Sequence, residues 1–267
     1  MEVAVPQPVA LPSAPLRRPY DRRGRARTQE LEVPIRLVPE HAEPEVHAAD
    51  DVLPRERSEI VSRVANVAIA SAALVAVSPI LAIIALLVKA TSRGPILYRQ
   101  TRVGVDRRFR SKLEYDRRGY DHGGMPFRIY KFRSMRVDAE KNGPVWATPE
   151  DARVTPIGGL LRKSRLDELP QLFNVIRGDM NIVGPRPERP KIVAEMRVAI
   201  PQYQMRHRVK PGITGWAQVN QAYDFTVDDV KRKIDYDLEY LRKQSLLEDL
   251  RIMSMTIPVV LFRRGGW

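Results

Sequence analysis

Asp167 and Glu168 form an adjacent pair of carboxylates in the stretch SRLDELPQLFNVIRGDMNIVGPRP, which ends at Pro187. Ser164, followed three residues later by an acidic residue, resembles a capping box, and Pro170 is typical of the first turn of a helix. The pattern predicts that the two carboxylates lie at or near a helix N-terminus. The helix dipole and the free amides of such a site favour ionised carboxylates and also bind phosphate.

Arg162, Lys163 and Arg165 add positive charge within one or two turns of this pair. A carboxylate beside an anion-binding site is suited to nucleophilic attack on phosphorus, because the cations neutralise the charge of the substrate as the carboxylate approaches it. The alternative is that the two carboxylates only cap a helix and pair with the arginines. Taken alone, these residues favour that second interpretation.

The composition indicates a folded protein with an anionic partner. The chain has 267 residues, enough for one large domain or two small ones, and 43% of them are hydrophobic and 29% charged. The formal net charge of +13 suggests nucleic acid, nucleotide phosphates or an acidic membrane surface as the partner. The absence of cysteine excludes disulfides, thiolate metal sites and a cysteine nucleophile, and it is compatible with a reducing compartment.

An apolar run precedes the polar part of the chain. Val64 to Val88 contains no charged residue and is long enough to enter a membrane, since spanning the hydrocarbon takes ~20 residues. Ser78-Pro79 lies in the middle of this run, where the proline predicts a kink and the serine hydroxyl can bond a carbonyl that the kink frees. Basic residues flank both ends of the run and place both on the cytoplasmic side by the positive-inside rule: Arg57, Arg63, Lys89 and Arg93.

We therefore expect a re-entrant membrane helix broken at Ser78-Pro79, with a kinked span as the open alternative. No secretory signal is visible at the start of the sequence, so the N-terminus is expected in the cytoplasm. The expected organisation is a disordered Pro- and Arg-rich tail over 1–56, the membrane helix over 57–93, and a folded domain at the membrane interface over 94–267, with 106–124 as an inserted loop.

The folded domain is expected to be mainly α-helical with a small β element. Pro126 to Met135 has aromatic and aliphatic residues near alternating positions and predicts a strand or hairpin arm. Asp228 to Lys243 is amphipathic and predicts a helix with one apolar face. The last segment, SLLEDLRIMSMTIPVVLFRR, predicts an interfacial amphipathic helix pinned by Arg263 and Arg264, or a core helix of the domain.

Three motifs carry a resemblance to a known family: YKFRSM, LLRKSRLDELPQLFNVIRGDMNIVGPRP and RHRVKPGITGWAQVN. From about Ser58 onward the sequence closely resembles the bacterial sugar transferases. These are the monotopic polyprenyl-phosphate phosphoglycosyl transferases that start surface-glycan assembly, here in their small single-module form. The match is collinear over several long motifs and is therefore highly specific. The membrane helix of the family is broken at Ser-Pro, which matches Ser78-Pro79.

The resemblance implies a two-step covalent mechanism. Asp167 would attack the β-phosphorus of a UDP-sugar and expel UMP. The phosphate of polyprenyl (undecaprenyl) phosphate would then take the sugar phosphate from the aspartate. Glu168 would position or deprotonate the lipid phosphate, or help Asp167 hold the Mg²⁺ that the family uses. The product would open the assembly of an exopolysaccharide, capsule or O-antigen type glycan.

Further residues match positions of the family that bind phosphate or the donor: Arg162, Lys131, Pro185, Arg186, Pro187 and Asp237. Each residue also has a purely structural alternative. Arg186 could lie in a surface turn, Lys131 could extend from the interface, and Asp237 could pair with Lys233 four residues earlier. His207, in the basic run RHRVK, is assigned no catalytic role.

The resemblance places the protein on the cytoplasmic face of the bacterial inner membrane, with a second copy or other glycan-assembly enzymes as candidate partners. Two other classes are alternatives: a membrane-anchored protein that holds nucleic acid or an acidic polymer, and an inactive partner in glycan assembly. The basic residues are spread along the chain without a known nucleic-acid module, so we expect no nucleic-acid partner. The intact Asp167-Glu168 pair argues against an inactive protein.

Overall fold

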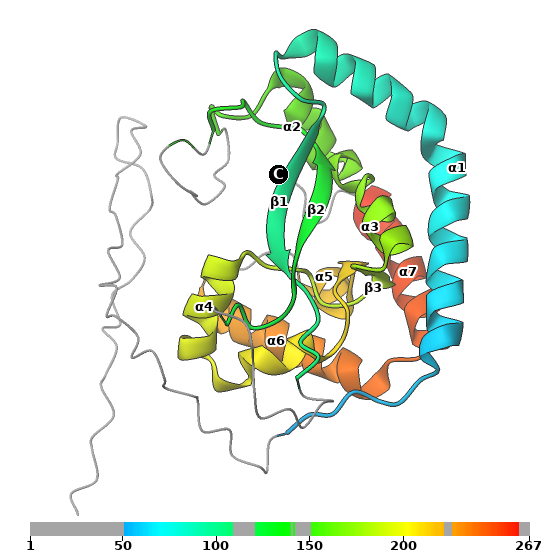
Figure 1. Ribbon diagram of the computed structural model, residues 1–267, viewed down its shortest axis with the longest axis vertical. Helices are drawn as coiled ribbons and strands as arrows, with labels where there is room; N and C mark the ends of the chain where they lie inside the picture. The colour runs from blue at the N-terminus through cyan, green and yellow to red at the C-terminus, as the bar shows by residue number, and fades with distance from the viewer. Residues whose placement is uncertain (1–50, 109–120, 140, 142–150, 222–225, 262–267) are drawn as a thin grey trace, which may run out of the picture. The chain divides into compact units, whose positions relative to one another are not determined.

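The computed structural model describes residues 51–108, 121–139, 141, 151–221 and 226–261 (Figure 1). The first element is α1 (Glu59–Thr91), a helix of 33 residues. Ser58 caps this helix, because its side chain accepts a hydrogen bond from the backbone N–H of Val61. The acidic Glu59 in the first turn and the basic Lys89 in the last turn both complement the helix dipole.

α1 stays helical through Pro79, so the expected break takes the form of a bend within a continuous helix. Figure 1 shows α1 changing direction along its course. The Ser78 hydroxyl donates to the carbonyl of Val75 at 2.8 Å. This carbonyl lies four residues before the proline and loses its usual backbone donor there, so the predicted role of Ser78 is confirmed.

By length and composition, α1 is the one helix in the described part of the chain that could cross a membrane. Only 11% of its most apolar stretch is buried inside the structure. Large apolar side chains are exposed along it, among them Val64, Val75, Ile83 and Leu86. An uncovered apolar surface of this length suits a helix that lies in lipid.

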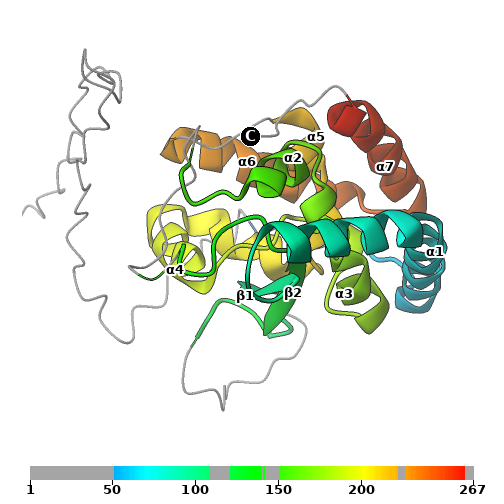
Figure 2. The same cartoon turned by 90° about the horizontal axis from the view of Figure 1, so that it is seen from above.

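α1 lies against the folded domain on both sides of Pro79. Before the proline, Ala70 is buried in a cluster with Ile129, Leu172, Val175 and Met180. After it, Ile84 and Val88 are buried in a second cluster with Phe132 and Leu161. In Figures 1 and 2, α1 accordingly runs beside α3 (Gln171–Arg177) and then towards α2 (Pro156–Lys163). The bend therefore lets one helix follow two different parts of the domain.

The first small sheet is an antiparallel pair of strands. β1 (Leu97–Val103) and β2 (Pro126–Phe132) pair along their whole length, with each end residue of one strand opposite an end residue of the other. The strand predicted over 126–135 is confirmed for its first seven residues. Ile129 and Phe132 point to opposite faces of the strand and are buried in different clusters, so both faces of β2 are packed against the rest of the domain.

The second small sheet is parallel and depends on glycine. β3 (Asn181–Val183) pairs with β4 (Gly212–Thr214). A Cβ atom on Gly212 would lie 2.1 Å from the backbone nitrogen of Gly184, so the two chain segments can approach this closely only without side chains. The approach brings together the segments GPRP and PGITG of the sequence.

The remaining described elements are helical, which confirms the prediction of a mainly α fold with a small β element. They are α2, the 3₁₀ turn η2 (Leu166–Glu168), α3, α4 (Pro190–Ala199), the 3₁₀ helix η3 (Pro201–Arg208), α5 (Trp216–Asn220), α6 (Val227–Lys243) and α7 (Leu246–Leu261). The amphipathic helix predicted over 228–243 is α6. Its first turn is closed by a capping box between Thr226 and Asp229, and it buries Ile234, Leu238 and Leu241.

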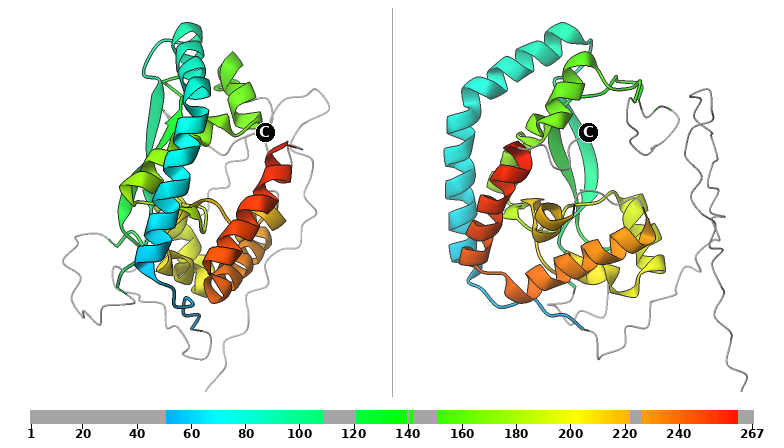
Figure 3. Two further views of the ribbon diagram at one scale, coloured as in Figure 1. Left: turned by 90° about the vertical axis from the view of Figure 1, so that its right-hand side faces the viewer. Right: turned by 180° about the vertical axis from the view of Figure 1, so that it is seen from behind.

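α7 combines features of both interpretations of the last segment. Figure 3 shows it rising at an angle from the end of α6, and it contacts β3. One face packs on the domain, where Ile252 is buried and the hydroxyl groups of Thr214 and Thr256 lie 2.8 Å apart. Leu247 and Ile257 are exposed on the helix. Core packing is therefore confirmed, contact with a membrane stays a prediction, and Arg263 and Arg264 lie outside the described residues.

The end of the predicted tail, residues 51–56, differs from the prediction because it packs on the domain. Val52 is buried, and its carbonyl accepts a hydrogen bond from Arg208 at 2.7 Å. The backbone N–H of Arg55 donates to the Leu241 carbonyl, and the Gln244 side chain donates to the Arg55 carbonyl, both at 2.8 Å. These hydrogen bonds extend the folded part to about residue 51. The rest of the predicted tail, 1–50, lies outside the described residues.

The two ends of the predicted insertion, 106–124, are joined to each other where the segment leaves the domain. The backbone N–H of Gly104 donates to the Met125 carbonyl at 2.9 Å, and Arg108 pairs with Asp121 at 3.0 Å. The Gln204 side chain of η3 donates to Asp106 at 2.8 Å, so the start of the insertion is bound to η3. The centre of the insertion, 109–120, lies outside the described residues.

Candidate active site

Asp167 and Glu168 lie on η2, a single 3₁₀ turn between α2 and α3, and both are buried. The predicted capping box is wrong, because Ser164 ends α2 and its hydroxyl donates to the Leu160 carbonyl at 2.7 Å. α3 begins only after Pro170, so the carboxylates precede that helix rather than occupying its first turn. A Ser-x-x-Asp pattern therefore marks a connection between two helices here.

Arg165 sets the direction of this connection. Its φ of 56° lies in the left-handed region, which is uncommon for a residue with a side chain. The turn reverses the chain directly after α2 and brings η2 against β2, where the two elements pack. A backbone conformation of this kind, next to a buried acidic pair, is a feature of functional sites.

Glu168 is held by two cations from distant parts of the sequence. Lys131 of β2 donates to Oε1 at 2.7 Å, and Arg186 donates to Oε1 at 2.5 Å and to Oε2 at 3.3 Å. Burial opposes the ionisation of Glu168, but the positive charges of Arg186 and Lys131 hold its pKa well below the usual range. Glu168 is therefore a carboxylate that orients two cations and is a weak base.

Asp167, unlike Glu168, is not bound by these cations. Asp167 is only 7% exposed, yet no other described residue donates a hydrogen bond to its carboxylate. Its pKa is raised to about 6, mainly by burial and also by the charge of Glu168, while the charges of Lys131, Arg186 and Arg162 act against this rise. The site thus contains one carboxylate that binds two cations and one carboxylate without a hydrogen bond from another described residue.

Arg162 comes from the last turn of α2, as a half-buried residue whose charge acts on Asp167. The structure thereby brings four of the predicted site residues to Asp167: Glu168, Lys131, Arg186 and Arg162. In the sequence, Lys131 and Arg186 lie 37 and 18 residues from Glu168. No local pattern could have revealed this grouping, and only the motifs suggested it.

The backbone of Pro185-Arg186-Pro187 is fixed by two arginines that sequence reasoning missed. Arg206 donates to the carbonyl of Arg186 at 3.0 Å, and Arg102 donates to the carbonyl of Pro187 at 3.0 Å. Arg206 stands in the basic run RHRVK, where nothing distinguishes it from its neighbours, and Arg102 is one of the two arginines on β1. Their importance follows only from their burial and from the carbonyls that they bind.

Asp237 is connected to Arg186 through one intervening residue, Arg206. It forms an ion pair with Arg206 at 2.7 Å, and both side chains are almost completely buried. Lys233 donates to Glu188 at 2.9 Å, and Glu188 also pairs with Arg102 at 3.4 Å. Asp237 thus supports the carbonyl of Arg186 through Arg206, and direct contact of Asp237 with a substrate stays a prediction.

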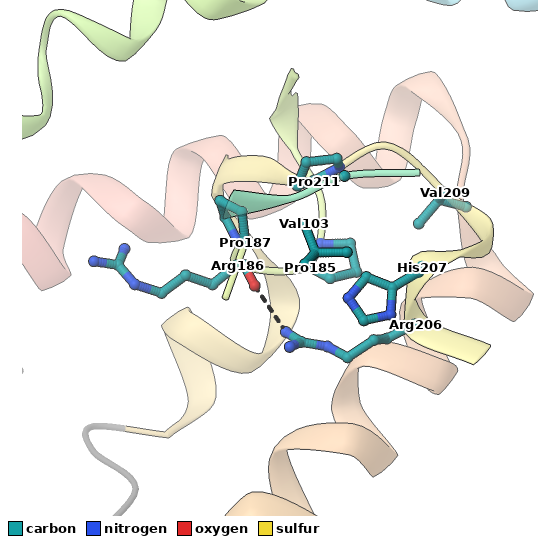
Figure 4. Close-up of a pocket in the computed structure, with 9 residues that line it drawn as sticks. Val103, Pro185, Arg186, Pro187, Arg206, His207, Val209 and Pro211 are labelled. Carbon is teal, nitrogen blue, oxygen red and sulfur yellow. Dashed lines mark hydrogen bonds between the residues drawn. The ribbon is translucent and has the colours of Figure 1, made fainter. Parts of the chain in front are cut away.

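A small pocket lies behind the Pro-Arg-Pro segment (Figure 4). Its lining residues are Val103, Gly104, Pro185, Arg186, Pro187, Arg206, His207, Val209 and Pro211. In Figure 4 the Arg186 side chain points away from this pocket, while its carbonyl faces Arg206. Burial, followed by the nearby charge of Arg206, lowers the pKa of His207 to about 3, so the imidazole is neutral. The Arg186 side chain, which binds Glu168, therefore lies on one side of the segment, and Arg206, which binds the Arg186 carbonyl, lies on the other.

Breaking the buried pair that supports Arg186 should be strongly destabilising. Asp237→Asn leaves the Arg206 guanidinium as a buried charge without its counter-ion, which costs about 3–5 kcal/mol in comparable sites. Chemical unfolding of the detergent-solubilised protein measures this loss. Asp228→Asn, at an exposed position of the same helix, is the matched control. A loss below about 1 kcal/mol for Asp237→Asn, a value typical of exposed pairs, would contradict this account of the pair.

The predicted Mg²⁺ fits the site only together with a substrate. The described residues contain no cluster of three or more His, Asp or Glu side chains that could hold a metal ion. At nucleotide sites, however, Mg²⁺ is usually held by one or two carboxylates, substrate phosphates and water. Both oxygens of Glu168 already accept hydrogen bonds, so Asp167 is the available protein ligand. Binding of Mg²⁺ stays a prediction.

Comparison with known proteins supports the resemblance seen in the motifs. The model of the family described as "Bacterial sugar transferase" matches residues 57–263. The chain therefore belongs to the bacterial sugar transferase family. The match includes α1, the Asp167-Glu168 pair and the Pro-Arg-Pro segment.

Several relatives have established names. The chain is 39% identical over 202 residues to the UDP-glucose:undecaprenyl-phosphate glucose-1-phosphate transferase of Escherichia coli (strain K12), covering 75% of this chain and 40% of that protein. It is 40% identical over 215 residues to the UDP-N-acetylgalactosamine-undecaprenyl-phosphate N-acetylgalactosaminephosphotransferase of Aeromonas hydrophila, covering 80% and 47%. It is 37% identical over 211 residues to the UDP-glucose:undecaprenyl-phosphate glucose-1-phosphate transferase of Caulobacter vibrioides, covering 78% and 73%. The chain thus spans less than half of the first two relatives.

Proposed function

We propose that this protein is a phosphoglycosyl transferase that moves a sugar-1-phosphate from a UDP-sugar to undecaprenyl phosphate and releases UMP. The observation that carries the proposal is the unequal carboxylate pair: Glu168 is neutralised by Lys131 and Arg186, and Asp167 is buried beside it without a hydrogen bond from another described residue. The names of the relatives support the same reaction.

In the first step, a carboxylate oxygen of Asp167 attacks the β-phosphorus of the donor. A bond forms between this oxygen and phosphorus, the bond from phosphorus to the oxygen that bridges the two phosphates breaks, and UMP leaves with that oxygen. Lys131, Arg186 and Arg162 supply positive charge around Asp167, where negative charge builds up on the phosphoryl oxygens. The product of this step is a sugar phosphate linked to Asp167.

In the second step, a phosphate oxygen of undecaprenyl phosphate attacks the same phosphorus, and the Asp167 carboxylate leaves. The diphosphate bond of the product forms as the acyl phosphate bond of the intermediate breaks. The low pKa of Glu168 makes it unsuitable as a general base. Its role in the proposal is to hold Lys131 and Arg186 in place for both phosphates.

Asp167 would help to hold Mg²⁺, and a bound Mg²⁺ would supply positive charge to the donor diphosphate and to the departing UMP. The residues of the protein perform the remaining tasks. Arg186 is held through its own carbonyl and both of its terminal nitrogens, so it presents a fixed charge. A fixed cation needs no reorganisation during the reaction and stabilises the transition state more than a mobile one.

The covalent step can be tested by mass spectrometry of the intact protein. After incubation with a panel of UDP-sugars and without an acceptor, we expect a mass increase of one sugar phosphate with the correct donor. Peptide analysis should locate the added mass on Asp167, and undecaprenyl phosphate should remove it. Turnover by a protein that never acquires this mass would contradict the covalent mechanism.

The same proposal includes a re-entrant α1, with the whole chain on the cytoplasmic face of the bacterial inner membrane. The two halves of α1 pack on the same domain before and after Pro79. A helix that spanned the bilayer would draw this domain into the hydrocarbon, where its exposed charged groups would be costly. Packing on both sides of the bend therefore favours a helix that returns to the face it entered.

Cysteine labelling can test this topology, because the natural sequence contains no cysteine. We expect single cysteines at positions 58 and 92, one on each side of α1, to react equally with a membrane-impermeant maleimide in inside-out vesicles and to be protected in cells. Reaction of the two positions from opposite faces would contradict the re-entrant arrangement.

The rate should depend on pH through Asp167. Its carboxylate must be ionised to attack, and its pKa is raised to about 6, so kcat/KM for the donor should fall about tenfold per pH unit below that value and level off above it. Initial rates of UMP release across this range measure the profile. A rate that stays constant well below pH 6 would indicate a different nucleophile.

The sugar itself is not assigned by the relatives, because their names include both glucose and N-acetylgalactosamine. One further relative, the exopolysaccharide production protein PSS of Rhizobium leguminosarum bv. phaseoli, is 35% identical over 201 residues and is covered over 92% of its length. We include in the proposal that the product opens the assembly of an extracellular polysaccharide.

A further inference from the structure

Two polar side chains of α1 bind the backbone of the catalytic domain. Arg63 donates through its two terminal nitrogens to the carbonyls of Val175 and Ile176, both at 2.5 Å. These carbonyls belong to the last turn of α3, where helix carbonyls lack their usual donor four residues later; the Val175 carbonyl also accepts from the Gly178 N–H at 3.0 Å. A cation at this position also complements the negative end of the helix dipole. Arg63 therefore caps α3 from outside.

Asn66 forms the second connection, one turn further along α1. It is 6% exposed, and its side-chain oxygen accepts a hydrogen bond from the backbone N–H of Ile182 at 2.7 Å. Its side-chain nitrogen donates to the Ser62 carbonyl at 2.8 Å. Ile182 is the central residue of β3, and its neighbours Asn181 and Val183 are the residues that pair with β4. Asn66 thus binds a strand N–H that points towards α1.

These connections differ in kind from the rest of the α1 contact. Beyond Asn66, the face of α1 that meets α3 is apolar, with Ala70 buried and Leu74 and Val77 packed beside it. Apolar contacts allow small shifts and rotations at low cost, whereas a buried amide or guanidinium that loses its acceptor leaves unpaired polar groups. Arg63 and Asn66 therefore fix the height and the rotation of α1 relative to the domain.

α3 connects the hydrogen bonds of Arg63 with the acidic pair. This helix begins three residues after Glu168 and is bound to β2 through Asn174, whose side chain accepts from the Tyr130 N–H at 3.1 Å and donates to the Arg128 carbonyl at 2.8 Å. Tyr130 is adjacent to Lys131. One end of α3 is thus bound by α1, its other end begins three residues after the acidic pair, and its β2 partner carries Lys131.

We propose that Arg63 and Asn66 are positioning residues for the acceptor step, because they hold Asp167 at the height in the membrane where the acceptor phosphate lies. The proposal rests on the proposed function. A UDP-sugar is water-soluble and can approach the site at any height. The phosphate of a polyprenyl acceptor is confined to the headgroup layer, so the second step alone depends on how far the site lies from α1.

The test separates the two half-reactions of the full-length protein in lipid vesicles. The variants are Arg63→Gln and Asn66→Leu, and Arg93→Gln is the matched control, since Arg93 is exposed just beyond the other end of α1. Loading is the rate of sugar phosphate addition to Asp167 without acceptor, and discharge is the rate of its removal by undecaprenyl phosphate. Discharge should slow by about 10- to 100-fold in both variants, because small misplacements have effects of this size, while loading stays at the wild-type rate.

A second acceptor distinguishes positioning from general damage to the fold. Geranyl phosphate is short enough to reach the site from water, so its discharge rate should be the same in the variants and in the wild-type protein. Arg63→Lys, which keeps the charge and loses the forked geometry, should show an intermediate effect. It replaces Arg63→Gln if that variant does not fold.

Three results would overturn the proposal. Equal slowing of loading and discharge would mean that Arg63 and Asn66 only stabilise the fold. Equal slowing with geranyl phosphate and undecaprenyl phosphate would exclude an effect of membrane height, and unchanged discharge in both variants would exclude any positioning role. If the wild-type protein never acquires the sugar phosphate, the proposed function itself is refuted, and this proposal falls with it.

Discussion

Asp167→Asn should lower turnover by about 10⁴-fold or more, because an amide cannot form the acyl phosphate and removal of a covalent nucleophile has effects of this size. The substitution keeps the shape of the side chain and removes a buried charge that no described residue binds directly, so the protein should fold normally. The measurement is UMP release, with the mass of the intact protein after incubation with donor. We expect neither product nor added mass.

The matched control for this variant is Asp138→Asn, which makes the same chemical change at an exposed aspartate paired with Arg136. It should retain wild-type turnover. If Asp167→Asn keeps more than about a tenth of the wild-type rate, Asp167 is not the nucleophile, since no other group could replace it at that rate.

Lys131→Met should lower the rate at neutral pH by about 10²–10³-fold, the usual effect of losing one donor that stabilises negative charge in the transition state. It should also move the acidic limb of the pH profile upward. The direction follows from the charge, since Lys131 is the largest influence that lowers the pKa of Asp167. Without this charge, the carboxylate ionises only at higher pH.

The pH profile distinguishes this effect from simple destabilisation, because a loss of folded protein would reduce the rate equally at every pH. Lys131→Arg should recover part of the rate, since it restores the charge next to Glu168. Lys191→Met, on the exposed face of α4, is the control for the loss of one positive charge. An acidic limb that stays in place in Lys131→Met would contradict the electrostatic role of Lys131.

Elements with a strong periodic pattern could be predicted from the sequence. α1 follows from an uncharged apolar run, β2 from alternation, and α6 from apolar residues at helical spacing. For β2 and α6 the pattern reflects which face of the element is buried, and for α1 it is the length of the uncharged run; both kinds of information are local. The hydroxyl of Ser78 could be predicted as well, because the carbonyl it binds is three residues away.

The local structure of the acidic pair could not be predicted in the same way. Ser164 and Asp167 have the spacing of a capping box, but Arg165 adopts a left-handed conformation between them and turns the segment into a connection. What selects this conformation is the packing of η2 on β2 and α2, which no pattern of neighbouring residues encodes. The sequence therefore drew attention to the acidic pair but did not predict the element that carries it.

The long-range support of the site was also invisible in the sequence. Arg206 and Asp237 are 31 residues apart, and each resembles the charged residues around it. Asn66 and Arg63 stand at the start of an apolar helix, where the flanking charge was interpreted only as a signal of topology. Their partners are backbone groups of α3 and β3, and such groups have no signature in the side-chain sequence.

The identity of the nucleotide product tests the central claim most directly. The detergent-solubilised protein is incubated with Mg²⁺, undecaprenyl phosphate and one UDP-sugar at a time, and UMP and UDP are measured separately. The account predicts UMP in equal amount to the lipid-linked sugar, with the donor that the enzyme uses. Release of UDP would mean that the sugar is transferred without its phosphate, and attack of Asp167 on the β-phosphorus would then be contradicted.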